Sequence, residues 1–394
     1  MLRDLSNGSH RRSRSIRDCA LLTPVLLFLL AGAAHATELT VNNTTDPASG
    51  TASNCAPANA NTCSLRDAVA AAGDGDLIGF AVGNNPTITL PSNAPLAVGL
   101  NVTIDGGNSP GLTVDGNNAT TVFSITGGTV SISNLSIAHG QASVTDPYQA
   151  AGQYDGGAIF NASVLTLDQV TIHDNSANAR GGGIYNFTGL VTMTNSTVSG
   201  NSAPDGGGIF NADLVGTTNV AIVNSTITGN SATYGGGIEQ NCACSHVTLT
   251  NATLAGNSAS YGNGVAFGVA AIANSMVEDC GGVGVIDNGG NLDSGTSCLG
   301  STPANASSKS SAVLALGPLQ DNGGPTQTML PGAGSAAINS IVCANAPLVD
   351  QRNYLRPDPP SVGLATPCDV GAVEVGSMPD PIFANGFGPP PMYQ

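Results

Sequence analysis

The middle of the chain consists of short runs in which apolar and polar residues alternate, and glycine or asparagine ends each run. The runs are rich in Val, Ile and Thr, which is typical of β-strands, and the breaker residues suit left-handed turns between strands. No stretch in this region keeps a helical period long enough for a βαβ unit. The pattern therefore predicts many short strands joined by tight turns.

These runs repeat at a period of about 25 residues. "GGAIFN" (156–161) returns as "GGGIYN" (181–186) and "GGGIFN" (206–211), and related text follows at 235–240 and 262–267. Three short strands in each repeat, stacked repeat on repeat, predict an all-β, single-stranded parallel β-helix, because each coil can bury its apolar side chains only against its neighbours. Weaker copies of the pattern extend this region over residues 86–300.

Asparagine recurs at two fixed positions of the repeat. In a stacked coil, residues at one position form a column along the axis, and amide side chains in a column can hydrogen-bond to one another. We therefore interpret both columns as structural. One column contains Asn195, Asn224, Asn251 and Asn274. The other contains Asn175, Asn201, Asn230 and Asn257.

The two ends of the mature chain depart from the repeat. "NTCSLRDAVAAAG" (61–73) has the pattern of a short helix, which would cover the open strand edges of the first coil within an N-terminal cap at 37–85. After about residue 300 the chain is rich in proline and glycine. This composition predicts an irregular C-terminal domain at 301–375 and a flexible tail at 376–394.

Residues 1–36 have the three parts of a secretory signal peptide. Basic residues at 11–17 precede the apolar run "ALLTPVLLFLLAGAA", and "AHA" (34–36) is a small-x-small cleavage site. Pro24 interrupts the run, which falls short of the roughly 20 apolar residues of a membrane span. We expect the mature chain to begin near Thr37, to be exported and to contain no transmembrane span.

The charge of the chain excludes one class of partner. The net charge is −16, from 10 basic and 26 acidic residues. The signal peptide contains five of the basic residues and two of the acidic ones, so five basic and 24 acidic residues remain and the mature chain carries −19. Such a surface repels nucleic acid and anionic lipid. We therefore expect no nucleic-acid partner.

Eight of the nine cysteines remain after the signal peptide, and an even number in an exported chain indicates disulfides in an oxidising compartment. Proximity in the sequence predicts three pairs: Cys55 with Cys63, Cys280 with Cys298, and Cys343 with Cys368. Cys242 and Cys244 would give only three zinc ligands together with His246. We favour a disulfide there, whose pairing stays open, and predict no metal centre.

Three stretches resemble parts of one family of exported bacterial β-helix proteins. "CSLRDAVAAA" (63–72) resembles the N-terminal CSLREA domain, with Asp67 where that pattern has Glu. The "GGGI" and "NSTITGNSA" repeats resemble those of polymorphic outer membrane proteins and other pectate-lyase-like β-helices. "LGPLQDNGGPTQTMLPGAGSAAIN" (316–339), "DQRNYLRP" (350–357) and "CDVGAVE" (368–374) resemble a choice-of-anchor domain.

The resemblance implies a right-handed coil and residence outside the cell or at the bacterial cell surface, on the outer membrane. It implies little about activity, since many members of the family have no established enzymatic activity. Proteins with a choice-of-anchor domain attach to the cell envelope in different ways, and the tail here lacks an apolar span, so attachment stays open. We expect the chain to be a monomer.

A column of charged residues is the first candidate site. Arg180 precedes its glycine triplet just as Asp155 and Asp205 precede theirs, so stacking places the arginine between two carboxylates. In the structural interpretation the cation neutralises two acids at a turn. The catalytic interpretation follows from the likeness to pectate lyases, in which acids hold Ca²⁺ against an anionic sugar and an arginine removes the proton beside the carboxyl group. We favour the structural one, because two carboxylates are too few for a strong calcium site.

Aromatic residues follow the repeated isoleucine in three coils and form a second candidate site for ligands. By alternation, Phe160, Tyr185 and Phe210 point away from the isoleucines. They could form an outward ladder on which sugar rings stack, or an interior stack if a bulge intervenes. The insertion that carries Tyr148 and Tyr154 enters the same region and is the expected ligand-facing loop.

One histidine interrupts the repeat. His173 and Asp174 occupy the place of Ser199 and Gly200 one coil later. His173 could act as a general base in catalysis, although a histidine at a surface turn is the simpler interpretation. No motif of a serine hydrolase, a zinc enzyme or a phosphate-binding loop is recognisable.

These observations predict an exported, non-catalytic β-helix protein that presents a long face for adhesion or glycan binding. The alternative is a polysaccharide lyase or hydrolase that acts on acidic polysaccharide at Asp155, Arg180 and Asp205, with Ca²⁺ as the one cofactor to consider. A groove with several converging acids would favour the enzyme. A flat face lined by Asn and Thr would favour the binding protein, since β-helices host both roles.

Overall fold

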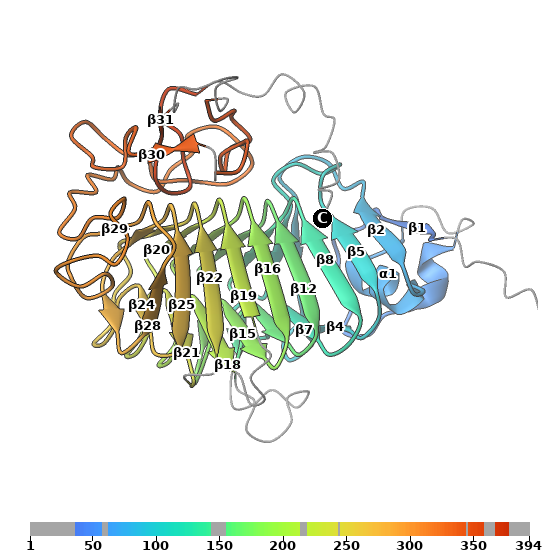
Figure 1. The fold of residues 1–394 in the computed structure, drawn as a ribbon. Coiled ribbons are helices and arrows are strands. Elements are labelled where there is room, and N and C mark those ends of the chain that lie inside the picture. The colour runs from blue at the N-terminus through green and yellow to red at the C-terminus, as the bar shows by residue number, and fades with distance from the viewer. Residues whose placement is uncertain are drawn as a thin grey trace, which may run out of the picture. The chain divides into compact units, whose positions relative to one another are not determined.

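The computed structural model describes residues 36–56, 62–142, 155–212, 219–242, 245–343, 346–357 and 367–377. All of them belong to one compact unit, Ala36–Gln394. Successive turns of the chain place their strands side by side in three parallel sheets that follow one axis (Figure 1). The chain is therefore a right-handed parallel β-helix, as predicted. Most of the predicted signal peptide and most of the predicted tail lie outside the described residues.

Most coils contribute one strand to each of the three sheets. The ten-stranded first sheet contains β1 (Glu38–Val41), β2 (Asp76–Phe80), β5 (Val102–Asp105), β8 (Thr129–Ser133), β12 (Val164–Asp168), β16 (Leu190–Thr194), β19 (Asn219–Val223), β22 (His246–Thr250), β25 (Val269–Ala273) and β28 (Gly284–Asp287). The eight-stranded second sheet contains β4 (Leu96–Val98), β7 (Phe123–Ile125), β11 (Ile159–Asn161), β15 (Ile184–Phe187), β18 (Ile209–Ala212), β21 (Ile238–Gln240), β24 (Val265–Ala266) and β27 (Cys280–Gly281). The nine-stranded third sheet contains β3 (Thr87–Thr89), β6 (Thr113–Asp115), β9 (Ser136–Ala138), β13 (Thr171–His173), β17 (Thr197–Ser199), β20 (Thr226–Thr228), β23 (Thr253–Leu254), β26 (Met276–Val277) and β29 (Leu292–Asp293). A short additional pair joins β10 (Gln141–Ala142) to β14 (Ser176–Ala177).

The repeated isoleucines align in register and fill the interior. Ile159 pairs with Ile184, Ile184 with Ile209, and Ile209 with Ile238. All four are fully buried and belong to a single core that runs from the first described coil to the last. Because the apolar side chains of one coil lie directly on those of the next, the hydrophobic period of the sequence becomes the stacking period of the coil.

The column that begins at Asn175 is a ladder of buried amides. The Asn175 Nδ2 donates to Oδ1 of Asn201, and Asn201 donates in the same way to Asn230, both at 2.9 Å. The same Oδ1 atoms also accept the backbone N–H of the preceding asparagine at 3.0 Å. Asn257 continues the ladder. The structural interpretation of this column is correct.

The second predicted column occupies left-handed turns. Asn195, Asn224, Asn251 and Asn274 all have φ between 45° and 51°, a backbone conformation that asparagine tolerates better than most residues. A third ladder, which the sequence did not single out, joins Asn161, Asn186 and Asn211 through Nδ2 to Oδ1 contacts of 2.8 Å.

Glycine is required where the chain turns into the second sheet. Gly181 has a φ of 63°, and a Cβ atom there would collide with the backbone of Ile184. The same turn recurs in each coil that carries the glycine triplet. Its geometry fixes the position of the residue just before it, which is Arg180 in this coil.

The N-terminal cap contains η1 (Ala52–Cys55) and the predicted helix, α1 (Leu65–Ala71). Ser64 and Asp67 form a capping box at the start of α1. The buried Arg66 pairs with Asp46 through Nη2 and Oδ2 at 2.7 Å. The helix packs against β1 and β4, so it covers the N-terminal end of the core.

The three predicted disulfides are present, joining Cys55 to Cys63, Cys280 to Cys298 and Cys343 to Cys368. Cys242 is also disulfide-bonded, which agrees with the choice of a disulfide over a metal site there. Cys244 lies outside the described residues. No helix among the described residues is long and apolar enough to cross a membrane.

The C-terminal region folds back on the coil. It contains the antiparallel pair β30 (Ile341–Val342) and β31 (Pro367–Cys368). Gln351 reaches the third sheet: its Nε2 donates to Thr197 Oγ1 at 2.8 Å, and its Oε1 accepts from Thr226 Oγ1 at 2.7 Å. This amide therefore links the C-terminal region to two successive coils.

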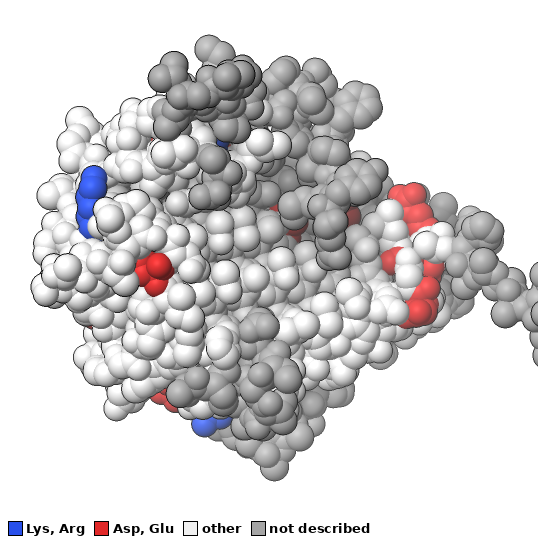
Figure 2. All heavy atoms as spheres, viewed as in Figure 1, with Lys and Arg blue, Asp and Glu red and all other residues white. Residues whose placement is uncertain are grey.

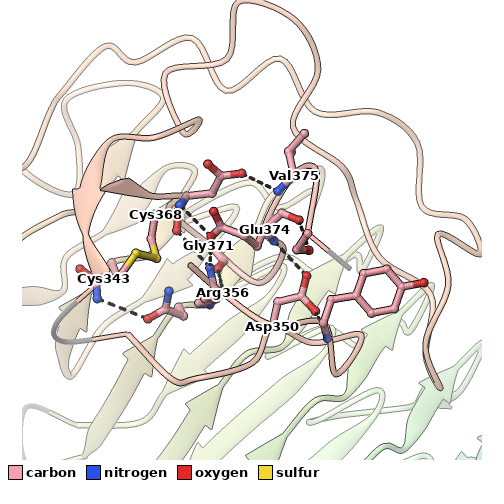
Figure 3. Close-up of polar contacts among 12 residues, drawn as sticks. Cys343, Asp350, Arg356, Cys368, Gly371, Glu374 and Val375 are labelled. Carbon is pink, nitrogen blue, oxygen red and sulfur yellow. Dashed lines mark hydrogen bonds and ion pairs between the residues drawn. A yellow bond between two sulfur atoms is a disulfide. The ribbon is translucent and has the colours of Figure 1, made fainter. Parts of the chain in front are cut away.

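A buried network of charges holds the C-terminal region together (Figure 3). Arg356 donates to Glu374 Oε2 at 3.0 Å and to the Gly371 carbonyl at 2.9 Å. Asp350 Oδ2 accepts the backbone N–H of Glu374 at 3.0 Å. Burial lowers the pKa of Arg356 and raises that of Glu374, and the contact between the two compensates part of this desolvation.

The Asn201→Ala variant tests the amide ladder. The substitution leaves the backbone N–H of Asn175 without its acceptor in the interior, and we expect the free energy of unfolding to fall by roughly 2 kcal/mol or more. Urea denaturation followed by circular dichroism measures the change. The matched control is Asn84→Ala at an exposed position, for which we expect a change within about 0.5 kcal/mol. Equal midpoints for the two variants would contradict a stabilising role for the ladder.

Candidate functional site

A row of five side chains follows the helix axis just before the glycine turns, and we call it the axial row. Its members lie on successive coils and align through single parallel bridges: Asp155, Arg180, Asp205, Tyr234 and Tyr261. Four coil steps at about 4.8 Å give the row a length of roughly 19 Å. The predicted placement of the arginine between two aspartates is correct.

Arg180 lies between Asp155 and Asp205, and its contacts with both carboxylates are long. Its Nη1 is 3.8 Å from Asp155 Oδ2, and its Nε is 3.9 Å from Asp205 Oδ2. The guanidinium also lies over the ring of Phe210, with Cζ 5.4 Å from the ring centroid. The Arg180 side chain is 43 % exposed, whereas that of Asp155 is buried. Arg180 is therefore held in place on one side and accessible to a ligand on the other.

Asp155 is a buried carboxyl group beside an exposed cation. Burial raises its pKa to about 6, although the charge and the backbone N–H of Arg180 act in the opposite direction. Burial also raises the pKa of the Tyr185 hydroxyl, and the charge of Asp155 adds to this effect. Arg180 therefore couples electrostatically to both groups.

Glu239 brings a third carboxyl group to this corner of the coil. It pairs in register with Phe210 and so continues the aromatic column. Burial, followed by the charge of Asp205, raises its pKa to about 8, and the backbone N–H of Gly206 and the charge of Arg180 lower it only in part. Oε2 of Glu239 has no hydrogen-bond partner among the described residues. In the sequence, Glu239 follows the repeated isoleucine as Phe210 does, but nothing there marked it as a site residue.

The aromatic column is buried, so it does not form the exposed ladder considered from the sequence. Phe160, Tyr185 and Phe210 lie on the opposite side of the strands from the isoleucine core, as alternation requires, but only 3–6 % of each residue is exposed. Ring centroids are 5.8 Å apart for Phe160 and Tyr185, and 5.6 Å apart for Tyr185 and Phe210. With Phe187 they form a small hydrophobic cluster outside the main core. Its faces are used for packing and are not open to a sugar ring.

Exposed aromatic rings occur instead at the C-terminal end of the axial row. Tyr234 and Tyr261 are 42 % and 41 % exposed, and their ring centroids are 6.3 Å apart. Phe267 stacks against Tyr261 at 5.3 Å. The sequence pattern did not predict this site. The available signal was that Tyr234 and Tyr261 share the repeat position of Arg180.

His173 belongs to a different part of the coil. It pairs with Ser199 in the third sheet, as the repeat predicted. Its Nδ1 is 2.9 Å from Asp174 Oδ2, and its ring lies near that of His139. Its ion-pair partner among the described residues is therefore Asp174, and the structure does not bring His173 to the acids of the axial row.

Two expectations from the sequence stay predictions. Tyr148 and Tyr154 are among the residues that the structure does not describe. Within the described part of the chain, no three His, Cys, Asp or Glu side chains are arranged to hold a metal ion. Calcium at Asp155 and Asp205 stays a prediction.

The pKa of Glu239 predicts how stability depends on pH. The folded chain keeps this proton up to about pH 8, whereas the unfolded chain releases it near pH 4.5. Over that interval the folded state binds more protons, so the free energy of unfolding falls as the pH rises. We expect Glu239→Gln to remove most of this decline and to be more stable than the native chain at about pH 9, by at least about 1 kcal/mol.

Thermal unfolding at a series of pH values measures this effect. Glu38→Gln, at an exposed position, is the control and should follow the native pH profile. A Glu239→Gln profile parallel to that of the native chain would show that the proton on Glu239 does not contribute to stability.

Comparison with known proteins adds two distant likenesses of fold. No family model matches the sequence, and no curated protein matches it. A crystal structure of Jun a 1, the major allergen from cedar pollen, is 15 % identical over 70 % of this chain and 77 % of that chain, with a TM-score of 0.39. The crystal structure of pectate lyase Pel9A is 16 % identical over 87 % of this chain and 97 % of that chain, with a TM-score of 0.28. At TM-scores this low, neither likeness bears on what this chain binds or catalyses.

Proposed function

We propose that this protein is a non-catalytic, exported β-helix protein that binds a polysaccharide or a cell-surface glycan along the axial row. The observation that carries the proposal is the alignment of the half-exposed Arg180 with the exposed rings of Tyr234 and Tyr261. Aromatic faces stack on sugar rings, and a guanidinium donates several hydrogen bonds to hydroxyl or carboxylate oxygens. A linear polymer that follows the axis would meet both kinds of group in turn.

The outer face of the first sheet supports a binding role. The residues at its centre form one in-register column, which contains Thr103, Ser131, Thr166, Thr192, Ala221 and Thr248. This face is nearly free of charge along the middle of the coil (Figure 2). The hydroxyl groups of these residues can donate and accept hydrogen bonds with a glycan.

The proposed location follows from the ends of the chain and its cysteines. The disulfides indicate an oxidising compartment. The predicted signal peptide, and the resemblance of the cap and of the C-terminal region to CSLREA and choice-of-anchor domains, support a location outside the cell or on the outer membrane. Attachment to the envelope through the C-terminal region and a monomeric state belong to the same proposal.

A second function is favoured by one observation. Asp155 and Glu239 are buried carboxyl groups with pKa values raised to about 6 and about 8, and both interact with Arg180. Perturbed carboxyl groups around an accessible cation occur at catalytic sites. A polysaccharide lyase or hydrolase that acts at Asp155, Arg180 and Asp205 is therefore the alternative proposal.

Retention on immobilised polysaccharides tests the binding proposal. We expect Tyr234→Ala and Tyr261→Ala to weaken binding about 2- to 10-fold each, which corresponds to the loss of one stacking contact. Leu348→Ala, an exposed apolar residue in the C-terminal region, is the matched control and should bind like the native chain. Binding that is unchanged in the double tyrosine variant would exclude the axial row as the ligand site.

Turnover measurements distinguish the two functions. The mature chain is incubated with acidic polysaccharides, with and without Ca²⁺, and unsaturated products and reducing ends are followed. We expect no turnover, together with weaker retention of acidic polymers by Arg180→Ala, since a cation that contacts the ligand is lost. Turnover by the native chain that disappears in Arg180→Ala would establish the enzyme instead.

A further inference from the structure

Two histidines meet at the edge of the third sheet, on successive coils. Ala138 pairs in register with His173, and His139 follows Ala138 in a left-handed conformation with a φ of 50°. The two imidazole rings are diagonal neighbours, with centroids 6.2 Å apart and planes at 76°. Three histidines follow the predicted signal peptide, so two of the three lie in this pair.

Each imidazole is oriented by its own carboxylate. His139 Nδ1 is 3.0 Å from Asp115 Oδ2, and His173 Nδ1 is 2.9 Å from Asp174 Oδ2. A carboxylate at Nδ1 favours the tautomer in which Nδ1 carries the proton and Nε2 carries the lone pair. Carboxylate partners of this kind are typical of histidines that bind metals, because they fix the ring and raise the basicity of the free nitrogen.

The arrangement is a local departure from the repeat. On the next coils the positions of His173 and Asp174 are taken by Ser199 and Gly200, and then by Thr228 and Gly229. The regular turn therefore needs neither an imidazole nor a carboxylate. His173 and Asp174 are thus not required by the turn, and with His139 and Asp115 they form two carboxylate–imidazole pairs at one place, which suggests a function for them beyond folding.

The spacing of the rings suits a shared ion after a small movement. Two imidazoles that bind one tetrahedral ion through nitrogens at about 2.0–2.1 Å have centroids about 5 Å apart. The observed separation of 6.2 Å exceeds this by about 1 Å. The side chains of His139 and His173 are 44 % and 31 % exposed, so rotation of the rings meets little resistance from packing.

We propose that His139 and His173 form a two-histidine site for a divalent transition metal ion, bound through the two Nε2 atoms, with Asp115 and Asp174 as positioning residues. Imidazole nitrogen suits Zn²⁺, Cu²⁺ and Ni²⁺, whereas Ca²⁺ and Mg²⁺ require oxygen ligands. Within the described residues no third protein ligand converges on the site. Water therefore completes the coordination sphere, and the affinity is moderate.

His173 and Asp174 lie at a groove between the coil and the C-terminal region. His173, Asp174, Ser199, Thr228, Leu319 and Gln327 are among the residues that line this groove, which has a volume of about 660 Å³. The remaining coordination positions are thus within reach of solvent and of a small oxygen or nitrogen donor. This site is separate from the axial row, and its occupancy does not depend on the proposed glycan binding.

Calorimetric titration of the untagged, chelator-treated mature chain with ZnCl₂ and NiCl₂ tests the proposal. We expect one equivalent of ion to bind. His139→Ala and His173→Ala should each weaken binding at least about tenfold, and Asp174→Asn should weaken it to a smaller extent. His246→Ala is the matched control, because it removes the remaining histidine of the mature chain, and it should bind like the native protein. An excess of Ca²⁺ should not displace the ion.

A second readout identifies the ligands directly. The electron paramagnetic resonance spectrum of the Cu²⁺-loaded chain should show coupling to two imidazole nitrogens in the native protein and to one in either single variant. Circular dichroism melting confirms that each variant is folded. Binding that survives in the His139→Ala, His173→Ala double variant, binding that is lost in His246→Ala, or a native chain that binds no ion would overturn the proposal.

Discussion

In-register stacking of the coils is the constraint on which the rest of this structure depends. A single coil has no core of its own, so its isoleucines are buried only when the coils above and below lie in the same register. The amide ladder at Asn175, Asn201 and Asn230 makes that register specific. A slip by one residue would reverse the two faces of every strand and leave buried amide groups without partners.

Fixed register gives every departure from the repeat a defined place in space. A residue type that recurs at one position of the repeat forms a column along the axis. A different residue at that position in one coil therefore lies at a defined point along the column. The axial row arises in this way, with an aspartate, an arginine and a second aspartate followed by two tyrosines. The histidine pair arises in the same way on the third sheet. The residues that follow the repeat form the scaffold, and the residues that depart from it form the candidate sites.

The buried carboxyl groups around Arg180 lower the stability of the fold. Asp155 and Glu239 are carboxyl groups from which burial has removed water, and this raises the pKa of each. Arg180 offsets only part of that effect, since its closest acid contacts are 3.8 Å and 3.9 Å long. In the asparagine ladders, by contrast, buried amide groups pair with one another. Unfavourable groups concentrated at one site are more easily explained by ligand contact than by folding.

The sequence by itself determined the coil, the strand positions, the three disulfides and the alignment of Asp155, Arg180 and Asp205, because period and spacing are properties of the chain that stacking converts directly into neighbours. It did not determine which columns are exposed. Phe160, Tyr185 and Phe210 point outward and are nevertheless buried, whereas Tyr234 and Tyr261 are exposed. Exposure depends on what packs over the outer face of a strand, and the repeat carries no information about that.

The contact between His139 and His173 was also decided only by tertiary structure. The two residues differ by one position in the repeat, so they become neighbours through a diagonal contact between coils.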